Sequence, residues 1–198
     1  FAYFKTKNNK SFSKEVLEEL MQGYFTEKEP LKINHSFGKE SLAYLPELGY
    51  FNKLGQKVQE CHIIKNTQIE LLYRPFELLN SVFELASSDS TSNEIEMSSS
   101  LFEKFVPNIE KALKLIKENC TEHFNLIEKH CKRIILFKTN PKNTNSFATI
   151  NAHGMAFLNA YQEDYDEVFF IDDIGHQTGH MIMTAILYER KKYFLIDE

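Results

Sequence analysis

Two histidines four residues apart are the residues of this sequence best suited to bind a metal ion. They lie in Ile174-Gly-His176-Gln177-Thr-Gly-His180, within an otherwise apolar stretch. On an α-helix, residues four apart rise about 6 Å along the axis and share one face, so both imidazole rings can reach one ion. Neutral imidazole suits zinc, iron, nickel and copper better than calcium or magnesium. The spacing predicts that His176 and His180 bind a transition metal on a buried helix.

The residue after the first histidine limits this chemistry. Metal-dependent peptidases carry glutamate there as the general base for the metal-bound water, and this chain has Gln177. An amide does not accept that proton at neutral pH. We therefore expect Gln177 to support a metal ligand or to contact substrate. Asp172 and Asp173, near one turn before His176, are expected to accept hydrogen bonds from the imidazoles.

A metal site needs at least one more ligand. The candidates within the chain are His153, Glu189, Asp197 and Glu198, and the residues do not decide among them. The chain begins without a methionine, and a fragment is one of two open interpretations; in that case the third ligand can also lie after Glu198. Two core histidines that only form hydrogen bonds are the alternative to a metal site.

Two glycines accompany the histidines at the same helical spacing. Gly175 and Gly179 each cost a helix interior about 1 kcal/mol relative to alanine. Their presence predicts that another backbone, either a strand or a bound ligand, approaches the helix closely beside the histidines.

The elements expected to position this helix make an α+β fold. Residues 1–86 are predicted to be mainly helical, with helices starting at Ser13, between Gly55 and Tyr73, and over 76–86. The Ser-rich residues 87–100 are predicted to form a flexible loop or linker. Residues 101–198 are predicted to form an α+β region in which a small sheet packs against the histidine helix.

Within residues 101–198 the pattern changes from helix to strand and back. A long helix is expected from Pro107 to Cys131, with Cys120 and Cys131 in its core-facing stripe. Short apolar runs predict strands at 134–137, 147–150 and 155–158. The last helix is expected over 166–189 and buried on most sides, although 168–171 also fits a strand.

The composition excludes several classes of protein. Hydrophobic residues at 42% and charged residues at 26% are ordinary for a globular chain. The net charge of −5 and the absence of a basic cluster argue against nucleic-acid binding. No apolar run reaches the ~18 residues of a membrane span. Three cysteines without a CxxC spacing indicate neither disulfides nor a thiolate zinc site, and they fit the cytoplasm. The oligomeric state is not indicated.

The stretch from Asn145 to Gly154, followed by Ile174 to Met181, resembles the HExxH-motif proteins linked to peptide modification. Some of that group are 2-oxoglutarate-dependent peptide β-hydroxylases. The resemblance implies iron(II) held by His176, His180 and a third side chain, 2-oxoglutarate as co-substrate, and a peptide substrate. Two other hypotheses stay open. One is a zincin-like zinc hydrolase, degenerate because of Gln177, and the other is a non-catalytic binding module.

Overall fold

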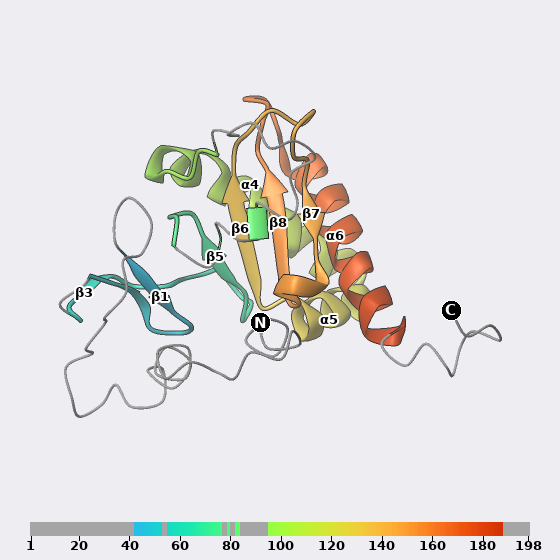
Figure 1. The fold of residues 1–198 in the computed structure, drawn as a ribbon. Coiled ribbons are helices and arrows are strands. Elements are labelled where there is room, and N and C mark those ends of the chain that lie inside the picture. The colour runs from blue at the N-terminus through green and yellow to red at the C-terminus, as the bar shows by residue number, and fades with distance from the viewer. Residues whose placement is uncertain (1–41, 53–54, 77–78, 80–81, 84–94, 188–198) are drawn as a thin grey trace, which may run out of the picture.

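The computed structural model describes residues 42–52, 55–76, 79, 82–83 and 95–187 (Figure 1). These residues form two sheets and the helices beside them, so the α+β class predicted from the sequence is confirmed. The smaller sheet is antiparallel and consists of β1 (Ala43–Leu45), β2 (Gly49–Phe51) and β3 (Lys57–Gln59).

The larger sheet has the strand order β4-β5-β6-β8-β7. Its central strands β5, β6 and β8 run parallel, whereas β4 and β7 pair antiparallel at the two edges. The predicted strands at 134–137 and 155–158 correspond to β6 and β8, and the strand predicted at 147–150 is shorter and is followed by a 3-10 turn at Ile150–Ala152. The bounds are β4 (His62–Ile63), β5 (Glu70–Leu72), β6 (Arg133–Phe137), β7 (Phe147–Ala148) and β8 (Met155–Asn159).

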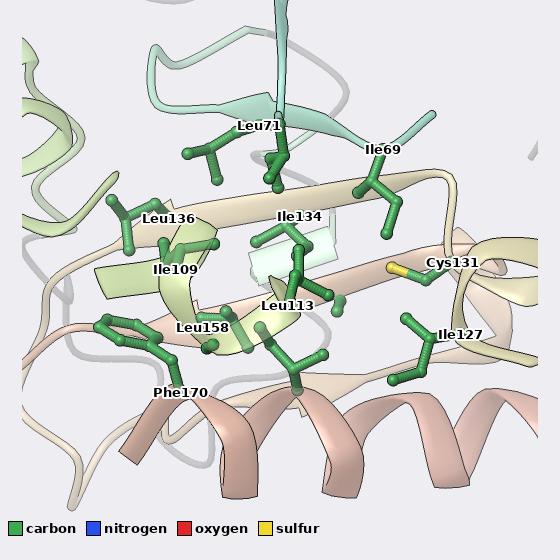
Figure 2. Packing of buried hydrophobic residues seen from close by; sticks show 14 of the residues in the cluster. Ile69, Leu71, Ile109, Leu113, Ile127, Cys131, Ile134, Leu136, Leu158 and Phe170 are labelled. Carbon is green, nitrogen blue, oxygen red and sulfur yellow. The ribbon is translucent and has the colours of Figure 1, made fainter. Parts of the chain in front are cut away.

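Three helices cover one face of this sheet, namely α4 (Ser99–Asn119), α5 (Thr121–His130) and α6 (Glu167–Leu187). Successive side chains of a strand point to opposite faces. Ile134 and Leu136 therefore pack toward the helices, where they meet Ile109 of α4 and Phe170 of α6 in one buried cluster (Figure 2). This packing fixes α6 along the sheet.

The opposite face of the sheet is rich in aromatic rings. Phe137 and Phe157 point to this side, where Phe83 contacts both rings at centroid distances of 5.0 and 5.6 Å. Phe147 stacks on Phe157 at 4.3 Å. Tyr50 of the smaller sheet belongs to the same buried cluster. The large sheet is thus covered on both faces, as parallel strands require.

A buried ion pair lies where the two sheets meet. The Nε atom of Arg133 on β6 is 2.7 Å from a carboxylate oxygen of Glu70 on β5, whose side chain is almost fully buried. The backbone N–H of Glu47, in the β1–β2 turn, donates to the other carboxylate oxygen. Glu70 therefore connects three segments of the fold through one side chain.

The helix predicted between Gly55 and Tyr73 is wrong, because β3, β4 and β5 occupy that range. A tight turn reverses the chain there: Asn66 adopts φ +60°, and the Thr67 hydroxyl accepts from the Ile69 N–H. The short apolar run of β5 is then buried beside β6. The predicted helix starting at Ser13 lies outside the described residues, and of 76–86 only residues 79, 82 and 83 are described as helical.

The long helix differs from the prediction at its start and in its middle. Ser98 caps α4 by accepting from the Leu101 N–H, so the helix begins before the end of the predicted loop and Pro107 lies inside it. Burial of Leu101 and Phe105 offsets the ~3 kcal/mol that an internal proline costs. Cys120 leaves the helical conformation, separates α4 from α5 and is exposed, whereas Cys131 is buried as expected. No helix in the described ranges could span a membrane.

Candidate metal site on helix α6

Helix α6 has one face that packs against the core and one that is exposed to solvent, here called the open face. Asp166 begins it by accepting from the N–H groups of Val168 and Phe169, so the strand alternative at 168–171 is wrong. Phe170 and Ile174 pack into the core, but Val168 on the other side is 64% exposed. His176 and His180 lie on this open face and are exposed. The prediction of a helix buried on most sides is therefore wrong for the described part of the chain, because the sheet covers only one face.

The two imidazole rings contact each other through their Nε2 atoms. Their Nε2 atoms are 3.0 Å apart and the rings are nearly perpendicular, at 83°. Two nitrogens bound at about 2.1 Å to one ion lie about 3.0 Å apart at a right angle and about 3.4 Å apart in a tetrahedron. The observed spacing also suits a hydrogen bond between the rings. The separation of the two Nε2 atoms therefore equals that of two adjacent ligands of an octahedral metal ion.

The described residues contain no group of three metal-binding side chains. His153 precedes β8, where His130 is an electrostatic neighbour, and it does not join the pair on α6. Asp172 is exposed on the same helix face, but it lies eight residues before His180, about 12 Å along the axis. The other predicted candidates, Glu189, Asp197 and Glu198, lie outside the described residues.

A buried polar network holds the inner face of α6. The Gln177 side-chain amide donates to one carboxylate oxygen of Asp173 at 3.0 Å, and the Ser146 hydroxyl donates to the other at 2.6 Å. Ser146 in turn accepts from the N–H of Asn159 at the end of β8. Gln177 and Asp173 thus face the sheet. The predicted roles of Gln177 at the metal or substrate, and of Asp173 as an imidazole acceptor, do not match this arrangement.

Two residues of this network were missed by the sequence interpretation. The Asn159 side chain donates to the carbonyl oxygens of Thr139 and Thr144 and accepts from the N–H of Thr139. Asn159 thereby closes the 139–146 loop, and Ser146 joins that loop to α6. The available signal was an asparagine at the end of an otherwise apolar strand, where a buried amide must find partners.

Burial raises the pKa of Asp173, because desolvation disfavours its carboxylate; the hydrogen bonds from Ser146 and Gln177 offset part of this effect. The folded state therefore holds this proton more strongly than the unfolded chain, whose aspartates titrate near about 3.9. Protonated Asp173 therefore stabilises the folded state at pH values below the unfolded-state pKa. This contribution to the free energy of unfolding is lost as the pH rises through the folded-state pKa. In metal-free buffer, wild-type stability relative to Asp173→Asn should decrease from pH 4 upward and then level off. Urea unfolding at several pH values tests this, and an opposite slope contradicts it.

The glycines of α6 face open space. A Cβ atom built on Gly175 or Gly179 would meet nothing within 4 Å, so the predicted approach of another backbone is not found among the described residues. In a chelator, Gly175→Ala and Gly179→Ala should each stabilise the chain by about 1 kcal/mol through helix propensity. We expect the melting temperature to rise about 2–4 °C for each. Gly49→Ala is the matched control. It should destabilise, since Gly49 has φ +101° and a Cβ atom added there would overlap the backbone oxygen of Gln59.

Comparison with family models, curated proteins and solved structures gave no match for this chain. The function is therefore argued from the site itself. Its main features are a pair of histidines in contact on the exposed helix face and a polar network that anchors the other face.

Proposed function

We propose that this chain is a metal-dependent enzyme that hydroxylates a peptide or protein side chain with iron(II) and 2-oxoglutarate. The observation that carries the proposal is the 3.0 Å separation of the His176 and His180 Nε2 atoms on an exposed helix face. Two histidines at adjacent octahedral positions are two of the three protein ligands of a two-histidine, one-carboxylate iron site. Bound iron(II) would supply oxygen activation, with 2-oxoglutarate as the co-substrate.

The inner face of α6 favours oxygenation over hydrolysis. A zinc hydrolase needs a general base beside the metal-bound water, but Gln177 is an amide turned toward Asp173 on the sheet side. Oxygenation needs no such base. The chain contributes two ligands, a helix anchored by the Asp173 network, and an open face that a peptide can reach.

The proposal includes a cytoplasmic location, with neither nucleic acid nor membrane as a partner. Cys61, Cys120 and Cys131 are all free thiols, which fits a reducing compartment and the iron(II) state. The net charge of −5 disfavours binding to phosphate backbones.

Succinate release tests the proposal. Protein loaded anaerobically with iron(II) should form succinate when given oxygen, 2-oxoglutarate and a peptide library. His176→Ala and His180→Ala should each lose the bound iron and the succinate. His153→Ala is the matched control, because it removes an exposed histidine away from the pair, and it should retain both.

Three results would contradict it. Stoichiometric iron without succinate across the library argues against an oxygenase. Peptide cleavage by the zinc-loaded protein would favour the hydrolase hypothesis. If both alanine variants leave metal content and melting temperature unchanged, the histidines hold no metal and a non-catalytic binding module is the better description.

A further inference from the structure

We infer that the open face of α6 binds an extended peptide with a basic side chain on one side of its target residue and an apolar side chain on the other. This inference rests on the proposed function, because the peptide is the proposed substrate. It adds the chemistry by which the substrate is recognised. It also assigns specificity to two residues outside the histidine pair, Asp172 and Met183.

The open face carries a continuous strip of exposed residues. Residues 172, 176, 179, 183 and 186 follow one another at steps of four and three, which keep them on one side of a helix. All five are exposed, and so is His180 beside them. The buried residues Phe170, Ile174 and Met181 lie on the opposite side of α6. The strip therefore offers accessible surface before, beside and after the histidine pair.

The end of this strip before the histidines is negatively charged. Residues 161–187 contain no lysine or arginine, and their six acidic residues are Glu163, Asp164, Asp166, Glu167, Asp172 and Asp173. Glu163 and Glu167 pair with lysines of other segments. Asp172 is exposed and has no ion-pair partner in the described ranges. A basic side chain of a bound peptide is complementary to this uncompensated charge.

The end of the strip after the histidines is apolar. Met183 and Ile186 are 55% and 47% exposed, and their spacing of three residues makes them neighbours on the helix surface. An apolar side chain that covers them removes its own surface and theirs from water, which favours binding. The two ends of the strip thus differ in chemistry. They favour a peptide with different side chains on the two sides of its target residue.

The centre of the strip leaves room for the target residue. A Cβ atom built on Gly179 would meet nothing within 4 Å, so the helix backbone is uncovered beside His180. A peptide approaches such a position more closely than it approaches a side chain. We therefore place the target residue at this level, where its side chain lies next to the histidine pair.

The rise of the helix sets the spacing of the recognised side chains. The midpoint of His176 and His180 is level with residue 178. Along the axis, Asp172 therefore lies about 9 Å before this midpoint and Met183 about 7.5 Å after it. An extended chain advances about 3.3 Å per residue. We expect the basic side chain about three residues from the target residue, and the apolar side chain about two residues from it on the other side.

Peptide titrations followed by NMR test the inference without metal. The ¹⁵N-labelled full chain, kept in a chelator, is titrated with an alanine-based peptide that carries lysine and leucine at the expected positions. The reversed peptide is tested as well, because either chain direction fits the strip. A third peptide has glutamate in place of lysine. The contact area is small, so we expect a dissociation constant on the order of 1 mM.

The amide signals of Asp172, Gly179 and Met183 should shift with at least one lysine peptide. Its affinity should exceed that of the matching glutamate peptide by about five-fold, the size of an exposed charge interaction. This difference should shrink at about 1 M salt, where the screening length falls to about 3 Å.

Two variants test the recognition residues. Asp172→Lys should reverse the preference, so that the glutamate peptide binds more tightly than the lysine peptide. Met183→Ser should weaken the binding of both peptides by about five-fold through lost apolar contact. Glu122→Lys and Leu126→Ser are the matched controls, because they change an exposed carboxylate and an exposed apolar side chain of a different helix, α5. Both controls should leave the affinities unchanged.

Three results would overturn the inference, namely no shifts on α6 at millimolar peptide, equal affinities for the lysine and glutamate peptides, or an unchanged preference in Asp172→Lys. The proposed function stands in these cases if the iron-loaded protein still forms succinate with other peptides. Peptide binding with the expected preference in a chain that binds no iron would instead remove the proposed function and leave the peptide-binding face.

Discussion

Arg133→Ala is expected to lower the free energy of unfolding by about 3–5 kcal/mol, because it leaves a buried carboxylate without its cation. Glu70 is 3% exposed, and its ion pair with Arg133 at 2.7 Å lies where the two sheets meet. Urea unfolding followed by circular dichroism measures the loss. The effect is large because water cannot reach the Glu70 side chain without opening the packing of β5 against β6.

An exposed ion pair provides the control. Lys65 contacts Glu110 at 2.9 Å, but its side chain is 77% exposed, so Lys65→Ala should cost less than about 1 kcal/mol. The double variant Glu70→Leu/Arg133→Met removes both charges and should be less damaging than Arg133→Ala alone. If Arg133→Ala and Lys65→Ala lowered the free energy of unfolding equally, burial would not determine the strength of these ion pairs.

Gln177→Glu should destabilise the chain by about 3 kcal/mol at pH 7 and should not create a hydrolase. The Gln177 amide donates to Asp173 at 3.0 Å, so glutamate would place two carboxylates in contact in a buried position. The two groups would share one proton, and the loss should therefore shrink as pH falls toward 5. Thermal unfolding from pH 5 to pH 8, with a peptide-cleavage assay of the zinc-loaded variant, checks both expectations.

Two further variants separate charge from shape. Gln177→Leu loses the hydrogen bond without adding charge, so its cost should change little with pH. The double variant Asp173→Asn/Gln177→Glu exchanges the amide and the carboxylate, and it should recover much of the lost stability because donor and acceptor still match. Peptide cleavage by Gln177→Glu that depends on zinc would contradict the inward orientation of this position.

The second half of the fold could largely be predicted from the sequence, and the described part of the first half could not. The strands at 134–137 and 155–158 are short apolar runs between turn residues, which is a local signal. The range 55–73 shows helical spacing, but its strands are stabilised by neighbours far away in the chain, as β5 is by β6. A local pattern cannot indicate such partners.

The histidine pair was found because its spacing is a local property of one helix. Which face of that helix is buried depends on tertiary packing, and α6 has apolar residues such as Val168 and Met183 on its outer face as well. The apolar composition therefore suggested burial on most sides. The roles of Ser146 and Asn159 arise from contacts across 27 and 20 residues, which no spacing rule anticipates.

The division of α6 into two faces separates two kinds of evolutionary change. Side chains on the inner face, such as Asp173 and Gln177, carry packing and hydrogen bonds, so changes there alter stability. Outer positions such as Asp172, His176 and His180 make few contacts within the described structure, so they can be exchanged with little effect on folding. Under the proposed function, metal preference on this scaffold is therefore open to selection, or to laboratory design, through a few substitutions that leave the fold intact.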